Sequence, residues 1–194
     1  IGASGALRGI FTVKDGFLET GGTMLMIASL TIGALLGELI NIEAQMERFG
    51  EWLKDKAKSS GDTKFVEGFV TASLTVCIGA MAIVGSIEDG ISGNHDTLFA
   101  KAALDLVIVM VFAATYGKGV AFSAIPVAIL QGTVTICAGF IAPIMNDSII
   151  ANISFIGSML IFCVGVNLSF GKKFKVGNML PAIIIPFICG LIAG

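Results

Sequence analysis

Charged residues are scarce in this chain of 194 residues, because Asp, Glu, Lys and Arg together make up 13% of it. A soluble domain usually has about a quarter of its residues charged and about 45–50% apolar. This chain is 55% hydrophobic, with a mean hydropathy of +0.93. So low a charge on so apolar a chain argues against a soluble globular domain and indicates a membrane protein.

Residues that carry common chemistry are also few. The one histidine, His95, lies in a polar segment and cannot by itself hold a metal ion. The four cysteines lie inside apolar runs without CxxC spacing, so we expect small buried side chains: Cys77, Cys137, Cys163 and Cys189. No catalytic triad, nucleotide-binding glycine motif or nucleic-acid-binding basic patch is visible in the sequence. We therefore expect no enzyme activity, cofactor, metal site or nucleic-acid partner.

Apolar runs long enough to cross the hydrocarbon core, which takes about 20 helical residues, occur six times. They are Thr20–Asn41, Phe65–Ile87, Thr97–Tyr116, Val120–Met145, Ile149–Phe170 and Asn178–Gly194. The first residues, Ile1–Val13, are similar to the second half of a further helix, so we expect the chain to begin inside one. The sequence thus predicts an all-α, polytopic transmembrane helical bundle in the lipid bilayer, with residues 1–194 as a single transmembrane domain.

Lysine and arginine gather in alternate connecting segments. Nine of them lie in the three segments that would share one side of the membrane: Arg48, Lys54, Lys56, Lys58, Lys64, Lys118, Lys172, Lys173 and Lys175. The opposite segments hold Lys14 alone and are otherwise acidic. Because basic loops stay in the cytoplasm, we expect the acidic loops to face outward.

Three related motifs recur along the chain: IGAS begins at Ile1, IGAM at Ile78 and IGSM at Ile156. One more predicted crossing separates the last two motifs than the first two, so we expect two parallel copies and a third, inverted one. Inverted repeats are common in transporters, whose substrate sites lie near the membrane midplane at the repeat interface. They also occur in channels and in some membrane enzymes.

The connecting segment Ile42–Asp62 is amphipathic. Apolar residues at helical spacing share one face, with Trp52 beside them, and charged residues occupy the rest: Ile42, Met46, Phe49 and Leu53 form that face. This pattern favours a cytoplasmic interfacial helix that lies in the lipid headgroups. Binding of a partner protein is the alternative.

Ionisable residues inside apolar helices are functional candidates, because a charge at the bilayer centre costs at least about 2.5 kcal/mol. Asp105 lies near the middle of its run, and Lys101, four residues earlier, would share its helical face. Either the two form an ion pair that locks helices together, or Asp105 belongs to a mid-membrane cation or proton site. Lys101 or Arg8 would then supply the counter-charge. Gln131, also central in its run, is either a substrate ligand or an interhelical hydrogen-bonding group.

Glu38 and Glu67 lie close to the cytoplasmic ends of their runs, where we expect snorkelling or pairing.

Helix-breaking residues cluster in two of the runs. Val120–Met145 contains Pro126, Gly132, Gly139 and Pro143, and the last run opens with NMLP and contains Pro186. We expect both helices to be kinked or partly unwound, with breaks near Pro126, Gly132, Asn178 and Pro181 lining the site. Interrupted helices can coordinate ions where they line a cavity, although proline kinks also occur without transport.

Several motifs together carry a family resemblance: GALLGE (Gly33–Glu38), GSIEDG (Gly85–Gly90), LFAKAALD (Leu98–Asp105) and VGNMLPA (Val176–Ala182). In order and spacing they resemble the bacterial membrane proteins of domain of unknown function 554, along nearly the whole chain. The resemblance implies a short multi-pass protein of the bacterial inner (plasma) membrane, without soluble domains and with a further N-terminal helix. It implies no activity and no site residues.

The predicted function is transport, as a carrier or a channel, of a small ion or polar solute. A cation is favoured because the acidic outer loops would concentrate one, while an arginine-lined anion path is an alternative. The second hypothesis is a non-transporting scaffold or partner subunit that uses Ile42–Asp62; assembly as a homo-oligomer is compatible with either. A membrane enzyme would need a reactive cluster, and the outer group that comes nearest is more simply a solvated loop: Glu88, Asp89, His95 and Asp96.

Overall fold

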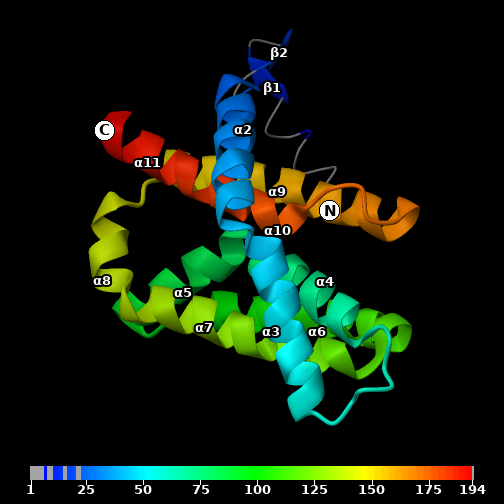
Figure 1. Ribbon diagram of the computed structural model, residues 1–194. Helices are drawn as coiled ribbons and strands as arrows, with labels where there is room; N and C mark the ends of the chain where they lie inside the picture. The colour runs from blue at the N-terminus through cyan, green and yellow to red at the C-terminus, as the bar shows by residue number, and fades with distance from the viewer. Residues whose placement is uncertain (1–6, 8–10, 15–16, 21–22, 194) are drawn as a thin grey trace. The chain divides into compact units, whose positions relative to one another are not determined.

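The computed structural model describes residues 7, 11–14, 17–20 and 23–193, and helices dominate it. The longer helices are α2 (Thr23–Ile40), α3 (Ile42–Lys56), α4 (Phe65–Cys77), α5 (Ala80–Ser92), α6 (Asp96–Tyr116), α7 (Ala124–Ile136), α9 (Asp147–Phe170) and α11 (Ile184–Ala193) (Figure 1). The shorter ones are α8 (Ala138–Ile141), α10 (Val176–Met179) and the 3-10 helices η1 (Gly117–Ser123), η2 (Ala142–Ile144) and η3 (Leu180–Ile183). The predicted all-α class is confirmed.

A short antiparallel hairpin precedes α2. Strand β1 (Phe11–Lys14) pairs with β2 (Phe17–Thr20), with Phe11 opposite Thr20. The predicted helix Ile1–Val13 is therefore wrong over residues 11–13, and apart from residue 7 its remainder lies outside the described residues. The physical reason is in the local sequence, since aromatic and β-branched residues flank an Asp-Gly pair, the strongest short-range signal for a hairpin.

Three helical runs in the described part of the chain are long and apolar enough to cross a membrane: Thr23–Ile40, Asp96–Ile136 and Asp147–Phe170. A fourth is obtained if α4 and α5, which are bent by 62°, count as one span. The helix predicted at Phe65–Ile87 is therefore broken at residues 78–79, and this bent pair corresponds to it. Gly79 weakens the helix there, since glycine loses the most backbone entropy on ordering.

The run Asp96–Ile136 is interrupted rather than continuous. A straight helix of its 41 residues would be about 60 Å long, twice the hydrocarbon thickness of about 30 Å. Gly117 has φ 76° and ψ −150°, a conformation that favours glycine, and it ends α6. The 3-10 helix η1 follows, and α7 begins after it, with Pro126 in its first turn. The helix predicted at Val120–Met145 is thus divided, as expected from its prolines and glycines.

The chain divides into two compact units, of which the first comprises residues 1–41, 78–80 and 144–194. In this unit α2 crosses α9 and the interrupted helix α10–η3–α11 and contacts both (Figure 1). Its core contains apolar side chains of α9 and of the interrupted helix: Ile149, Ile153, Ile156, Leu160, Val176 and Ala182.

The second unit comprises residues 42–77 and 81–143. Here α4 packs on α3, α6, η1 and α7. Phe65, Phe69 and Val120 are fully buried, and the rings of Phe65 and Phe122 lie 5.3 Å apart. The start of α4 and η1 therefore form the core of this unit.

Glycines let backbones touch in both units. Helix α2 buries Ser29, Gly33 and Gly37, which are four residues apart and share one face. A Cβ at Gly33 would overlap the backbone nitrogen of Ala182, and one at Gly37 would overlap the carbonyl oxygen of Asn178.

In the second unit a Cβ at Gly119 would overlap the carbonyl oxygen of Phe65, and one at Gly68 would lie 2.6 Å from Cβ of Tyr116. These are the small-residue contacts by which membrane helices approach closely.

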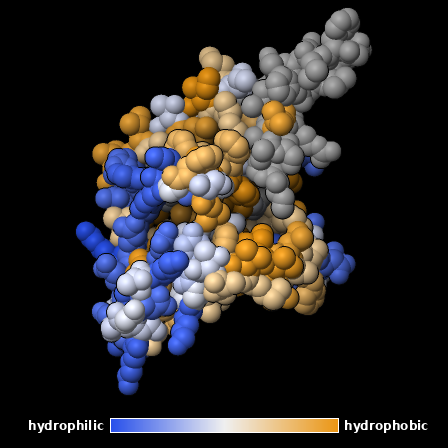
Figure 2. Space-filling view, turned by 90° about the vertical axis from the view of Figure 1, so that its right-hand side faces the viewer, coloured by the Kyte–Doolittle hydropathy of each residue, from blue (hydrophilic) through white to orange (hydrophobic). Residues whose placement is uncertain are grey.

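Large apolar side chains cover much of the surface, as the orange areas of Figure 2 show. Helix α6 alone exposes six of them: Phe99, Leu104, Leu106, Val107, Met110 and Val111. Soluble monomers rarely expose so much contiguous apolar area. This surface fits contact with lipid acyl chains.

Two of the three related motifs lie beside each other in the first unit. A Cβ at Gly157, in IGSM, would be 3.8 Å from Cγ2 of Ile78 and 3.9 Å from Cα of Gly79, in IGAM. The first motif, at residues 1–4, lies outside the described residues. The internal repeat itself stays a prediction.

The contact of α2 with α10–η3 predicts a contrast between two glycine variants. Gly37→Ala should destabilise the protein, because overpacking of this kind costs about 1–3 kcal/mol. Gly165→Ala, in α9 with nothing within 4 Å of its added Cβ, should be neutral or stabilising by up to about 1 kcal/mol through helix propensity. Thermal unfolding of the purified protein in detergent measures both. Equal melting temperatures would contradict the contact.

Candidate functional site

A charged pair lies in the second unit, on α6. Lys101 Nζ donates a hydrogen bond to Asp105 Oδ2, and the two residues are one helical turn apart. The side chain of Lys101 is 8% exposed and that of Asp105 is 21% exposed. Both therefore point into the unit, although most of the apolar residues of the same helix are exposed. The predicted pairing of Lys101 with Asp105 agrees with this geometry.

Asp105 lies near the middle of α6, and Lys101 lies one turn closer to the start of the helix. Helix α6 has 21 residues and is about 30 Å long, which matches the hydrocarbon thickness. Cys77, at the end of α4, lies within electrostatic reach of both charges. The pair thus faces α4, which packs against α6.

Both partners of the pair belong to the same helix. An ion pair within one helix cannot tie two helices together, which was the structural role considered for Asp105. It neutralises two charges that would otherwise be costly in an apolar environment.

The other residues predicted for this site are not joined to the pair. Gln131 is half-buried on α7, and its side chain makes no hydrogen bond to the described residues. Gly132 follows it, with open space around its added Cβ, and Pro126 lies in the first turn of α7. Arg8 lies outside the described residues. The site that these residues would form with Asp105 stays a prediction.

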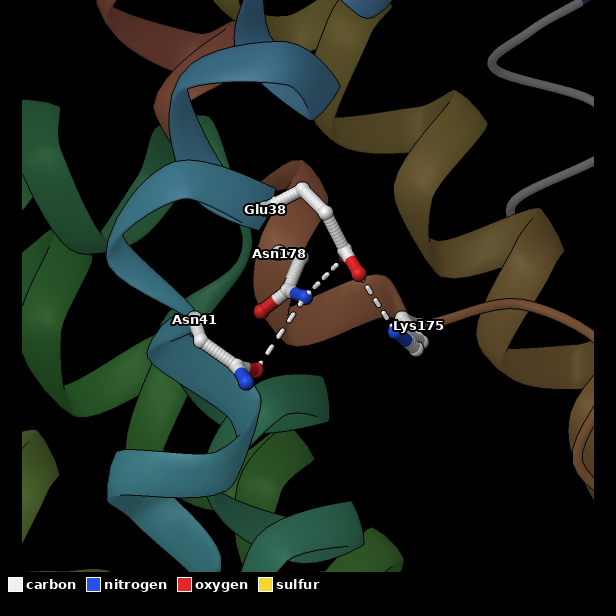
Figure 3. A network of polar contacts seen from close by, with 4 residues as sticks. All are labelled: Glu38, Asn41, Lys175 and Asn178. Atoms are coloured by element: carbon white, nitrogen blue, oxygen red, sulfur yellow. Dashed lines mark hydrogen bonds and ion pairs between the residues drawn. The ribbon is translucent and has the colours of Figure 1, made fainter.

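A polar cluster in the first unit joins the end of α2 to α10 (Figure 3). Asn178 Nδ2 donates to Glu38 Oε2 at 2.6 Å and to Asn41 Oδ1 at 3.5 Å. Lys175 Nζ donates to the other carboxylate oxygen of Glu38 at 2.5 Å. Asn178 is 2% exposed, whereas the side chains of Glu38 and Lys175 are more than half exposed. The predicted pairing of Glu38 is confirmed, and its partner is Lys175.

Local backbone features hold the cluster in place. Asn41 has φ 53° and ends α2, in a left-handed conformation that asparagine tolerates. On the other side, Asn167 of α9 accepts from the backbone N–H groups of Lys173 and Phe174 and donates to the Phe174 carbonyl. Asn167 thereby fixes the loop that presents Lys175. The sequence analysis did not predict a role for Asn167, because a bond from one side chain to the loop that follows its helix leaves no periodic pattern in the sequence.

The interrupted helix supplies the buried member of the cluster. Asn178 belongs to the single turn α10, and Pro181 lies in η3, buried and followed by α11. The Ile184 N–H bonds to the Pro181 carbonyl, a 3-10 pattern that continues the break into α11. The helix predicted at Asn178–Gly194 therefore departs from α geometry at Pro181, as expected, but not at Asn178, which lies within α10. Their part in binding a substrate stays a prediction.

The acidic group at the end of α5 and the start of α6 forms local contacts. Thr97 Oγ1 donates to Glu88 Oε2 at 2.6 Å, and His95 Nδ1 contacts Asp89 Oδ1. Across the described residues, no three His, Cys, Asp or Glu side chains stand together in a way that could hold a metal ion. The expected solvated loop is therefore wrong for Glu88 and Asp89, which are half-buried on α5, whereas His95 and Asp96 are exposed.

Helix α3 occupies the first part of the predicted amphipathic segment Ile42–Asp62 and ends at Lys56. It buries Glu43, Gly50 and Leu53, and it packs on α4. Phe49 and Trp52 are exposed and stacked, with ring centroids 5.8 Å apart, and Lys56 Nζ lies 5.8 Å from the Trp52 ring. An exposed aromatic pair with a lysine suits a membrane interface or a partner protein.

The buried pair predicts a rescue experiment. Lys101→Met should destabilise the protein by about 3–5 kcal/mol, because it leaves the Asp105 carboxylate without its partner. Adding Asp105→Leu should restore most of the lost stability, since two apolar side chains need no pairing. Thermal unfolding measures both, with Lys173→Met in the exposed loop as a control. Full stability of Lys101→Met alone would show that the charge of Asp105 needs no partner.

The polar cluster predicts a second contrast. Asn178→Ala should cost about 1–3 kcal/mol, because it removes a buried donor to Glu38. Lys175→Ala should change the melting temperature little, since an exposed ion pair contributes little. The reverse order of effects would place the stability of the cluster in its exposed ion pair.

The chain is similar to one protein family and to two known bacterial proteins. The family described as Protein of unknown function (DUF554) matches residues 1–191. The uncharacterized membrane protein YdfK of Bacillus subtilis (strain 168) is 32% identical over 186 residues, covering 96% of this chain and 78% of the relative. The uncharacterized protein YqgA of Escherichia coli (strain K12) is 29% identical over 164 residues, covering 82% of this chain and 70% of the relative.

No solved structure matches this chain. Long apolar helices, an apolar surface and the relative from Bacillus subtilis, which is named a membrane protein, agree on the class of protein. The chain is a helical membrane protein and belongs to the family Protein of unknown function (DUF554).

Proposed function

We propose that this chain is a multi-pass protein of the bacterial inner membrane that moves a small ion or polar solute, with Asp105 as the charged group of its path. Its basic connecting segments would lie in the cytoplasm and its acidic ones outside. Lys101 is the counter-charge, and Gln131 is a polar ligand on α7.

The observation that carries the proposal is that the buried ion pair belongs to one helix. A pair on one helix does not hold helices together, so its cost is not offset by a gain in packing between helices. Ionisable residues kept inside apolar helices mark ion and substrate paths by default. Lys101 can rotate away when a cation or proton takes its place at Asp105, which is a means of exchange.

The interrupted helices add a second line of support. In each unit a helix ends at a glycine with positive φ, Gly117 or Gly171, and a short 3-10 helix and a proline-containing helix come later in the chain. Discontinuous helices supply the helix ends and carbonyl groups that bind substrates and ions in transporters.

A second candidate function is a scaffold or partner subunit. The observation that favours it is the exposed stacked pair of Phe49 and Trp52 on α3. In that case Asp105 would stay sealed in its ion pair. The two functions differ in whether solute crosses the membrane.

The experiment is flux into proteoliposomes that contain the purified protein. Monovalent cations, protons and small organic ions are compared for wild type and Asp105→Asn. We expect the variant to lose at least about tenfold in flux, which corresponds to about 1.4 kcal/mol at the barrier. Asp147→Asn, at the start of α9, should leave flux unchanged.

Each variant is first shown to be monodisperse and to unfold at a defined temperature. Full flux in Asp105→Asn would remove Asp105 from the path. Absence of flux for every solute in the wild type would favour the scaffold.

A further inference from the structure

Ser29 differs from the other fully buried serines of the described chain. Its side chain is 0% exposed, and its Oγ has no hydrogen-bond partner among the described residues. Ser73 and Ser86 are also 0% exposed, but each donates to the carbonyl four residues earlier in its helix, at 2.6 Å and 2.7 Å. That local bond is the usual solution for a helical serine. The hydroxyl of Ser29 does not make this bond, so it is available to a ligand.

The face that Ser29 shares points at the interrupted helix. Gly37 of α2 contacts the backbone of Asn178. Gly33 lies one turn before Gly37, and it contacts the backbone of Ala182, which lies one turn after Asn178. The two helices are therefore antiparallel at this contact, and α2 also contacts α11. Ser29 lies one further turn along the same face. The register places it opposite the junction of η3 and α11, near Pro186.

That junction offers backbone oxygens. Pro186 is fully buried and has no N–H, so it cannot donate to the carbonyl of Ala182, as a residue in that position of an α-helix would. The 3-10 bond from Ile184 to Pro181 turns the adjacent peptide groups away from regular α geometry. The Ser29 hydroxyl and the Ala182 carbonyl, which receives no N–H from Pro186, therefore lie on helices that face each other in the buried part of this unit.

We propose that Ser29 Oγ and the carbonyl oxygens of the η3–α11 junction bind a small alkali-metal ion, with Na⁺ as the fitting size. This inference rests on the proposed function and names an ion that the protein would carry or couple to. Hydroxyl and carbonyl oxygens are hard, neutral donors, and unwound helix carbonyls coordinate Na⁺ in transporters.

The charge of the ion follows from the same residues. Carboxylates are the usual ligands that offset a divalent charge, and the acidic residue of α2, Glu38, lies nine residues from Ser29, about 13 Å along the helix. Glu38 is also engaged by Lys175 and Asn178. A monovalent ion is therefore the expected occupant.

The test is thermal unfolding of the purified full chain in NaCl and in choline chloride at equal ionic strength. A ligand that binds only the folded state raises its melting temperature with concentration. We expect a saturable rise with Na⁺ in the wild type, its loss in Ser29→Ala, and its retention in Ser73→Ala. Ser73 is the matched control, because it is equally buried but bonded within its own helix.

Direct binding of radioactive Na⁺ to the purified protein provides a second measurement if Ser29→Ala is less stable. Bound Na⁺ should be displaced by Li⁺ more readily than by K⁺, because the site is built for a small ion. No Na⁺ effect on wild type, an effect unchanged in Ser29→Ala, or a preference for K⁺ would overturn the proposal.

The outcomes for binding and for transport are separate. Na⁺ binding that depends on Ser29, with no solute flux in proteoliposomes, would keep the site and refute the transport function. Flux that depends on Asp105, with no Na⁺ effect on unfolding, would keep the transport function and refute the site.

Discussion

The backbone contact between α2 and the interrupted helix α10–η3–α11 is the constraint on which the first unit depends. Helices in a bilayer gain little from hydrophobic burial against each other, because lipid is as apolar as their side chains. Membrane helices associate instead through close van der Waals packing at small residues. Gly33 and Gly37 allow this close packing against Ala182 and Asn178. The same contact brings Glu38 beside Asn178 and buries Ser29 on the same face of α2.

The interrupted helices contain peptide groups without regular α-helical hydrogen bonds, and the surrounding structure must offset the free-energy cost of burying them. Peptide groups without water need internal partners, so irregular backbone inside a membrane occurs where protein or a cavity surrounds it. Here the 3-10 helix η3 is covered by α2, and η1 is covered by α4. Glycines at the contacts, Gly33 in one unit and Gly119 in the other, let the covering backbone come close enough to exclude other groups. Both units therefore handle a broken helix by the same physical means.

The charged groups divide into two kinds by their surroundings. Lys101 is buried and Asp105 is partly buried in an otherwise apolar helix, so separating the two charges without a replacement is costly. Glu38 and Lys175 are largely exposed, and their ion pair positions a loop more than it stabilises the fold. The buried pair is thus the one whose chemistry can be coupled to an ion or solute, while the exposed pair marks the end of α2.

The sequence by itself determined what depends on composition and on near neighbours. Low charge and long apolar runs decided the membrane class, and the ranges of α2, α6 and α9 agree with the runs that predicted them. The pairing of Lys101 with Asp105 was predictable, because residues four apart on a helix are neighbours whatever the fold. The prolines and glycines likewise predicted the divided helices, because their effect on the backbone is local.

Only the tertiary structure decided which distant segments meet. Glu38 and Asn178 are 140 residues apart, and no periodicity connects residues at such a separation. The hairpin at residues 11–20 and the break at residues 78–79 depend on short signals that an apolar run conceals. Ser29 belongs to the same class, because whether a serine bonds to its own helix or faces another is settled by what packs against it.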